Sequence, residues 1–145
     1  MIIPDLNLLI YAYNEDAPGH AGAKRWWEAS LSATRPVGLP WVVLLGFVRL
    51  MSNRRVLDEP MPADEAVQHC KAWLARPNAR IILPGPGHLD LLAHLLGAGS
   101  AGADLVTDAH LAALAIEHQA ELHSTDRDFA RFPGLRWRNP IAKNP

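Results

Sequence analysis

The chain has 145 residues, of which 49% are apolar and 20% charged, and its formal net charge is −1. This length suits one domain with a sizeable core, and the composition excludes a disordered chain. No apolar run is long enough to cross a membrane, and no basic region precedes the apolar N-terminus as it would in a signal peptide. The single cysteine, Cys70, excludes an internal disulfide. We therefore expect a cytoplasmic location.

Strands and helices alternate along the sequence. In chain order we predict a strand at 1–4, helices at 7–13 and 20–31, a strand at 35–40, helices at 41–52 and 62–76, a strand at 79–84, helices at 87–99 and within 104–119, a strand at 120–125, a helical turn at 126–132 and a strand at 134–137. We expect an irregular tail at 139–145. This alternation predicts a single α/β domain over 1–145 with a mainly parallel central sheet.

Four aspartates lie close to the ends of two predicted strands. Asp5 follows the first strand, Asp126 and Asp128 follow the strand at 120–125, and Asp108 opens the preceding helix. Functional groups of open parallel sheets gather at the carboxyl ends of the strands. If these two strands are neighbours, the four carboxylates converge although they come from opposite ends of the sequence.

Helix capping is the simpler explanation for each aspartate taken alone, because a carboxylate at a helix start binds free backbone N–H groups. Asp5, however, is flanked by core residues, and the other acids stand where the fold would bring them beside it. Clustered carboxylates raise one another's pKa, and a bound cation relieves that repulsion. A ligand set of carboxylate oxygens suits Mg²⁺ or Mn²⁺.

Three stretches resemble the PIN-domain ribonucleases, and above all the VapC-type toxins of bacterial toxin–antitoxin pairs: "PDLNLLIYAYN", "WVVLLGFVRLMSNRRV" and "TDAHLAALAIEHQAELHSTDRDFARFPGLRWRNP". The resemblance covers nearly the whole chain, and "DAHLAALA" and "TDRDF" are its most specific parts. It implies a PIN-like three-layer α/β/α fold. The site residues that it implies are catalytic Asp5, Asp108, Asp126 and Asp128, with Asp5 and Asp108 as metal ligands and Asn7 and Thr125 as polar neighbours that bind the substrate.

The resemblance also implies an activity and partners. The expected protein is a Mg²⁺-dependent endoribonuclease that leaves a 3′-hydroxyl and a 5′-phosphate, with arginines around the cleft holding the RNA backbone. The expected partners are a VapB-like antitoxin and a second copy of the chain in a homodimer. Two alternatives remain open: a PIN module that binds RNA or protein without catalysis, and a phosphohydrolase with an aspartate nucleophile. The second family has a D-x-D opening, whereas position 7 here is Asn7.

One position departs from the family. The helix after the second strand usually carries a glutamate, the second family acid, and Gly46 stands there instead. Gly46 either permits close helix packing or marks a lost metal ligand; we expect packing, with Asp128 supplying part of the missing charge. Arg49 shares the helix face of Gly46. It either contacts the acid cluster or a phosphate, or forms a structural ion pair.

Histidines and tryptophans suggest other chemistry that the spacing does not support. His110 and His118 are too far apart on one helix to share a metal easily, and His69, His88 and His94 have no matching partner. We therefore interpret the histidines as surface or partly buried residues. Most of the tryptophans lie on apolar helix faces and are expected to pack in the core or in a dimer.

Overall fold

The sheet has five parallel strands in the order β3-β2-β1-β4-β5. This arrangement comes from a computed structural model that describes residues 1–143. The strands are β1 (Ile2–Pro4), β2 (Val37–Pro40), β3 (Ala79–Ile82), β4 (Glu121–His123) and β5 (Trp137–Arg138). The predicted parallel sheet is confirmed.

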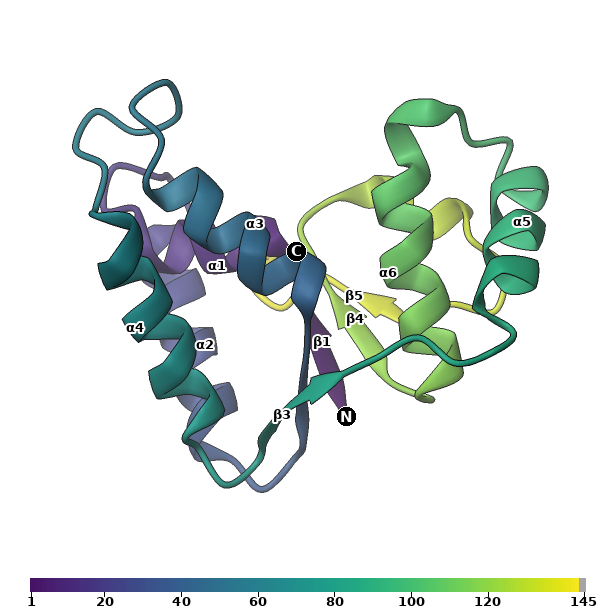
Figure 1. Ribbon diagram of the computed structural model, residues 1–145, viewed down its shortest axis with the longest axis horizontal. Coiled ribbons are helices and arrows are strands. Elements are labelled where there is room, and N and C mark those ends of the chain that lie inside the picture. Colours follow the sequence, from purple (N-terminus) through teal and green to yellow (C-terminus); the bar gives the residue numbers. More distant parts are fainter. Residues whose placement is uncertain (144–145) are drawn as a thin grey trace.

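Helices cover both faces of the sheet, which confirms the predicted three-layer α/β/α fold (Figure 1). One layer contains α1 (Leu6–Tyr13), α2 (His20–Ser32), α3 (Trp41–Met51) and α4 (Ala63–Leu74). The other contains α5 (His88–Ala98) and α6 (Val106–Glu117), and two 3₁₀ helices, η1 (Ala103–Leu105) and η2 (Arg127–Arg131), complete the elements. No helix within residues 1–143 is both long and apolar enough to span a membrane.

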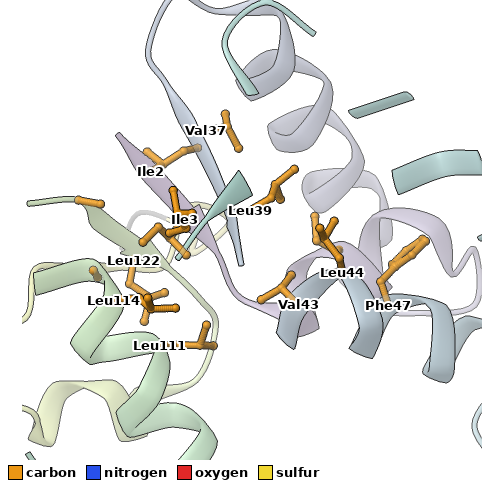
Figure 2. Close-up of a cluster of buried hydrophobic side chains, with 14 of the residues drawn as sticks. Ile2, Ile3, Val37, Leu39, Val43, Leu44, Phe47, Leu111, Leu114 and Leu122 are labelled. Atoms are coloured by element: carbon orange, nitrogen blue, oxygen red, sulfur yellow. The ribbon is translucent and has the colours of Figure 1, made fainter. Parts of the chain in front are cut away.

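The core lies on both sides of the central strands. Every residue of β1 and β2 is buried, as expected for parallel strands covered on both faces. Figure 2 shows Leu111 and Leu114 of α6 beside Leu122 of β4 in this core. Of the tryptophans expected to pack, Trp27 and Trp73 are buried, whereas Trp41 is half-exposed.

All five strands differ from their predicted ranges at one or both ends, and the last two differ most. β4 ends at His123 rather than at 125, and the side chain of the next residue, Ser124, enters a hydrogen-bond network described below. The last strand begins only at Trp137, because Gly134 has φ +79 and forms a turn. Residues 139–143 contain no helix or strand, as expected, and the last two residues of the predicted tail lie outside the described residues.

The connections place one strand end at a topological switch point. From β1 the chain builds β2 and β3 on one side, and it then returns through α5 and α6 to β4 on the other side of β1. Pro4 pairs in register with His123, and the Asp5 N–H donates to the His123 carbonyl over 2.8 Å. The residues that follow β1 and β4 therefore emerge side by side at the carboxyl edge, where open α/β sheets bind ligands.

Candidate active site

Ser124 connects the ends of β1 and β4. Its fully buried hydroxyl donates to Asp5 Oδ2 over 2.6 Å, and it accepts from the Asp126 N–H over 3.0 Å. The other Asp5 oxygen, Oδ1, accepts from the Leu6 N–H over 2.7 Å at the start of α1. Asp5 is thus a helix cap and, at the same time, a carboxylate aimed at the neighbouring strand end. The sequence reasoning missed Ser124, although its place directly after a strand was the available signal.

Asn7 lies on the first turn of α1 and faces the same strand end. Its Nδ2 donates to Thr125 Oγ1 over 2.9 Å and to Ser124 Oγ over 3.3 Å. The buried Oδ1 of Asn7 has no hydrogen-bond partner among the described residues. The two predicted polar neighbours, Asn7 and Thr125, are therefore in direct contact, and one buried acceptor oxygen is left over beside Asp5.

Asp126 and Asp128 begin η2, directly after β4. Asp126 caps this short helix, because its Oδ1 accepts from the Asp128 N–H over 2.8 Å. Asp128 accepts from Arg131 over 3.2 Å in an exposed i,i+3 pair. Both carboxylates retain acceptor capacity that these contacts do not use.

Asp108, in the first turn of α6, lies within the electrostatic reach of the other acids. Its pKa is raised to about 6, first by burial and then by the charges of Asp5, Asp126, Asp128 and Asp104. Burial also raises the pKa of Asp5, against the effect of its two hydrogen bonds, and the charge of Asp126 adds to the rise. The acids predicted from opposite ends of the sequence therefore share one region, where their charges disfavour the ionisation of Asp108 and of Asp5.

The oxygen donors of this region suit a hard cation, although the described residues do not form a preassembled metal site. Within residues 1–143, no three His, Cys, Asp or Glu side chains are close enough to hold a metal ion as they stand. What this region offers is oxygen: accumulated carboxylates and the partnerless Asn7 Oδ1. Mg²⁺ accepts such ligands and fills its remaining positions with water. The donors fit Mg²⁺, and the metal ligation by Asp5 and Asp108 stays a prediction.

Gly46 is buried on α3 at the contact with α1. A Cβ atom at this position would lie 2.6 Å from Leu6 Cδ2, closer than real side chains approach. This geometry gives the glycine a packing role, because it lets Leu6 fill the space where a side chain of residue 46 would begin.

Arg49 is exposed on α3 and forms no ion pair with an acid in the part of the chain that the structure describes. The structural ion pair considered for it is therefore absent from these residues. Its contact with the substrate stays a prediction.

The interpretation of the histidines as surface or partly buried residues was wrong for His123, which is buried at the end of β4, and for His88. His88 is buried at the start of α5, where Nδ1 lies 2.5 Å from Glu117 Oε1 and Nε2 lies 2.8 Å from His110 Nδ1. Both partners belong to α6, so the packing of α5 on α6 creates contacts that sequence spacing does not reveal. Burial, followed by the neighbouring His88, lowers the pKa of His110.

The fold and the site together define a class: a three-layer α/β protein with a carboxylate cluster at its topological switch point. The PIN domain family matches residues 2–135. Ribonuclease VapC33 of Mycobacterium tuberculosis is 42% identical, over 97% of this chain and 99% of its own length. Ribonuclease VapC37 of the same organism is 44% identical over 98% and 99%. The chain belongs to the PIN-domain family, among the VapC ribonucleases.

Solved structures agree on the fold. VapBC2 from Rickettsia felis, bound to a DNA fragment from its promoter, has a TM-score of 0.67 at 18% identity and covers 96% of this chain and 98% of its own. FitAB bound to a DNA fragment has a TM-score of 0.69 at 14% identity, with coverage of 100% and 99%. At these identities the likeness shows the fold alone.

Proposed function

We propose that the protein is a Mg²⁺-dependent endoribonuclease, the toxin of a type II toxin–antitoxin pair. The observation that carries the proposal is the convergence of the acids at the carboxyl edge of the sheet, where Ser124 bonds both Asp5 and the Asp126 N–H. Burial, and then the charges of these neighbouring acids, raises the pKa of Asp108 to about 6. Membership among the VapC ribonucleases supports RNA as the substrate class. The reaction would take place in the cytoplasm, as predicted from the sequence.

The geometry of the site supports a role for each residue in this proposal. Asp5 and Asp108 would hold the metal, assisted by Asp126 and Asp128, and Mn²⁺ could replace Mg²⁺. When bound, the metal would activate water and stabilise the charge on the scissile phosphate. Ser124 would hold Asp5 at the orientation set by its 2.6 Å hydrogen bond. The substrate contacts proposed from the sequence are Asn7, Thr125 and Arg49.

A VapB-like antitoxin is the proposed partner. A concentration of carboxylates is a strong docking point for an arginine, because charge-assisted hydrogen bonds are among the strongest that proteins form. The partner would insert such a side chain beside Asp5 and compete with Mg²⁺. Crosslinking or complex structures whose contacts lie wholly away from Asp5 would contradict this.

The homodimer also remains part of the proposal. Static light scattering of the purified chain measures its mass in solution, and the mass of a single chain would contradict the homodimer.

The direct test is RNA cleavage by the purified chain during a Mg²⁺ titration. Asp5→Asn should abolish cleavage and leave the fold intact. Asp64→Asn is the matched control, because Asp64 is exposed in the first turn of α4 and should not affect cleavage. In cells, induction of the parent but not of Asp5→Asn should produce new RNA 5′ ends. Equal cleavage by both chains would refute the proposed site.

A PIN module without catalysis is the second candidate, favoured by Gly46 at the place of a family acid and by the lack of a ready-made metal cage in residues 1–143. RNA binding that neither depends on Mg²⁺ nor leads to cleavage at any Mg²⁺ concentration would select this alternative. Hydrolysis of small phosphoesters without RNA cleavage would instead select a phosphohydrolase.

A further inference from the structure

The edge where the strands begin, opposite the aspartates, is positively charged. Arg35 precedes β2, Arg80 belongs to β3 and Arg136 precedes β5. The pKa of the Met1 amino group is lowered by burial and then by the charges of Arg35, Arg136 and Arg80. These guanidinium groups therefore gather around the start of β1, the edge that the N-terminus marks in Figure 1.

A pocket of about 270 Å³ lies between α2 and the strands β1, β4 and β5, and extends from Arg35 at this edge to His123 and Arg138, the last residues of β4 and β5. The residues that give it chemical character are Trp26, Ser30, Arg35, His123, Arg138 and Pro140. The volume is close to the lower end of small-ligand pockets, about 300 Å³. This size suits one flat, charged group rather than a folded partner.

Hydrogen bonds fix the aromatic wall of the pocket. Trp26 Nε1 donates to His123 Nδ1 over 3.1 Å, so the proton of His123 lies on Nε2, which is 2.7 Å from Glu121 Oε1. Burial lowers the pKa of His123, against the opposing effect of its contact with Glu121. The Trp26 ring is thus held in place before any ligand arrives, which reduces the entropy lost on binding.

The two arginines of the pocket are available to an anion. Arg138 is exposed and forms no ion pair within residues 1–143. Arg35 meets Glu121 only over 3.5 Å in an exposed contact, and such pairs contribute little. Glu121 is already engaged by His123, so Arg35 can turn towards a ligand at low cost.

We propose that this pocket binds one nucleotide of single-stranded RNA, with the phosphate on Arg35 and Arg138 and the base against Trp26. Guanidinium groups match phosphate geometry, and bases stack on aromatic side chains when they are not paired in a duplex. The proposal rests on RNA as the substrate class. None of the four aspartates lines the pocket, so it would contribute to affinity rather than to the chemical step.

The test measures binding of a short, labelled single-stranded RNA by fluorescence anisotropy in EDTA, where the acid site has no metal. Arg35→Gln combined with Arg138→Gln should weaken binding about tenfold, and the loss of one neutralised phosphate should reduce the salt slope by about 0.7. Arg54→Gln combined with Arg55→Gln removes the same charge at exposed positions and should change neither quantity. Circular dichroism checks that all variants fold.

Two further arms distinguish a nucleotide from a simple anion. Trp26→Phe should weaken binding several-fold at an unchanged salt slope, and duplex RNA of the same length should bind less tightly. Equal effects of the two double variants would overturn the proposal, because net charge alone would explain them. An unchanged affinity of Trp26→Phe, or equal binding of the duplex, would also overturn it.

The result is separable from the nuclease proposal. A chain that binds RNA as expected in EDTA but never cleaves it with Mg²⁺ refutes the nuclease and leaves the pocket standing. A chain that cleaves RNA with Mg²⁺, but whose RNA affinity is unchanged by the Arg35 and Arg138 substitutions, supports the nuclease and refutes the pocket.

Discussion

The Ser124 hydroxyl lies 2.6 Å from the Asp5 carboxylate, although 119 positions separate the two residues. The parallel pairing of β1 with β4 brings them together, because each follows the last paired residue of its strand. The contact depends on two things: where each strand ends, which is local, and the pairing of β1 with β4, which is set by the topology of the sheet. Ser124 is therefore the residue whose removal tests the geometry of the site most directly.

Ser124→Ala should destabilise the protein by about 2 kcal/mol, because the Asp126 N–H and the Asp5 carboxylate both lose a buried partner. It should also weaken Mg²⁺ binding by releasing Asp5 from its orientation. Urea unfolding and a calorimetric Mg²⁺ titration measure the two effects. Ser52→Ala is the control, since the Ser52 hydroxyl bonds only the carbonyls of its own helix. Equal losses in both variants would show that Ser124 has no special role.

Asp108→Asn should stabilise the metal-free protein above neutral pH. The folded pKa of Asp108 is about 6 and its ordinary value is 3.8, so protonation favours folding. That contribution is fully present below pH 3.8, and it is lost as the pH rises through 6. The variant should therefore match the parent near pH 4 and exceed it by about 1 kcal/mol at pH 7.5, after allowance for solvent screening.

Urea unfolding in EDTA across this pH range provides the measurement for Asp108. Asp104→Asn is the matched control, because Asp104 is exposed in η1 and contributes last among the causes that raise the pKa of Asp108. A parent chain that gains stability between pH 4 and 7 relative to Asp108→Asn would contradict the crowding of charges at this site.

Asp128→Asn tests whether Asp128 compensates for the acid missing at Gly46. Its charge is among those that raise the pKa of Asp108, although its own side chain is 47% exposed and paired with Arg131. We expect Mg²⁺ affinity to fall about tenfold, and Arg131→Gln to leave it within about twofold. If Asp128→Asn leaves the Mg²⁺ titration unchanged, Asp128 does not compensate for the missing acid, and the site consists of Asp5, Asp108 and Asp126.

The order of helices and strands could be predicted because each depends on local periodicity, and the convergence of the acids followed from the rules for parallel sheets. The contact of His88 with His110 and Glu117 could not, because it depends on how α5 packs against α6. The positively charged edge where the strands begin could not be predicted either. Arg35, Arg80 and Arg136 are scattered in sequence, and only the order of the strands brings them together.

Gly46 is the position where the sequence left two explanations open, and a double-mutant cycle with Leu6 separates them. Alanine is favoured over glycine inside a helix by about 1 kcal/mol. In the parent, however, its Cβ would lie 2.6 Å from Leu6 Cδ2, and overpacking costs about 1–3 kcal/mol. The atom in the way is the end of the flexible, partly exposed Leu6 side chain, which has to move. We therefore expect Gly46→Ala to stabilise the Leu6→Ala variant by about 1 kcal/mol and to stabilise the parent less, or not at all.

The cycle is measured by urea unfolding in EDTA, so that metal binding does not contribute. Gly97→Ala is the control, because a Cβ at this exposed position of α5 would meet no atom within 4 Å, and it should be stabilising in both backgrounds. Gly46→Glu, which restores the family acid, should bind Mg²⁺ more tightly only when combined with Leu6→Ala. If Gly46→Ala is equally stabilising with and without Leu6, packing against Leu6 does not explain the glycine. The explanation that Gly46 replaces a lost metal ligand is then favoured.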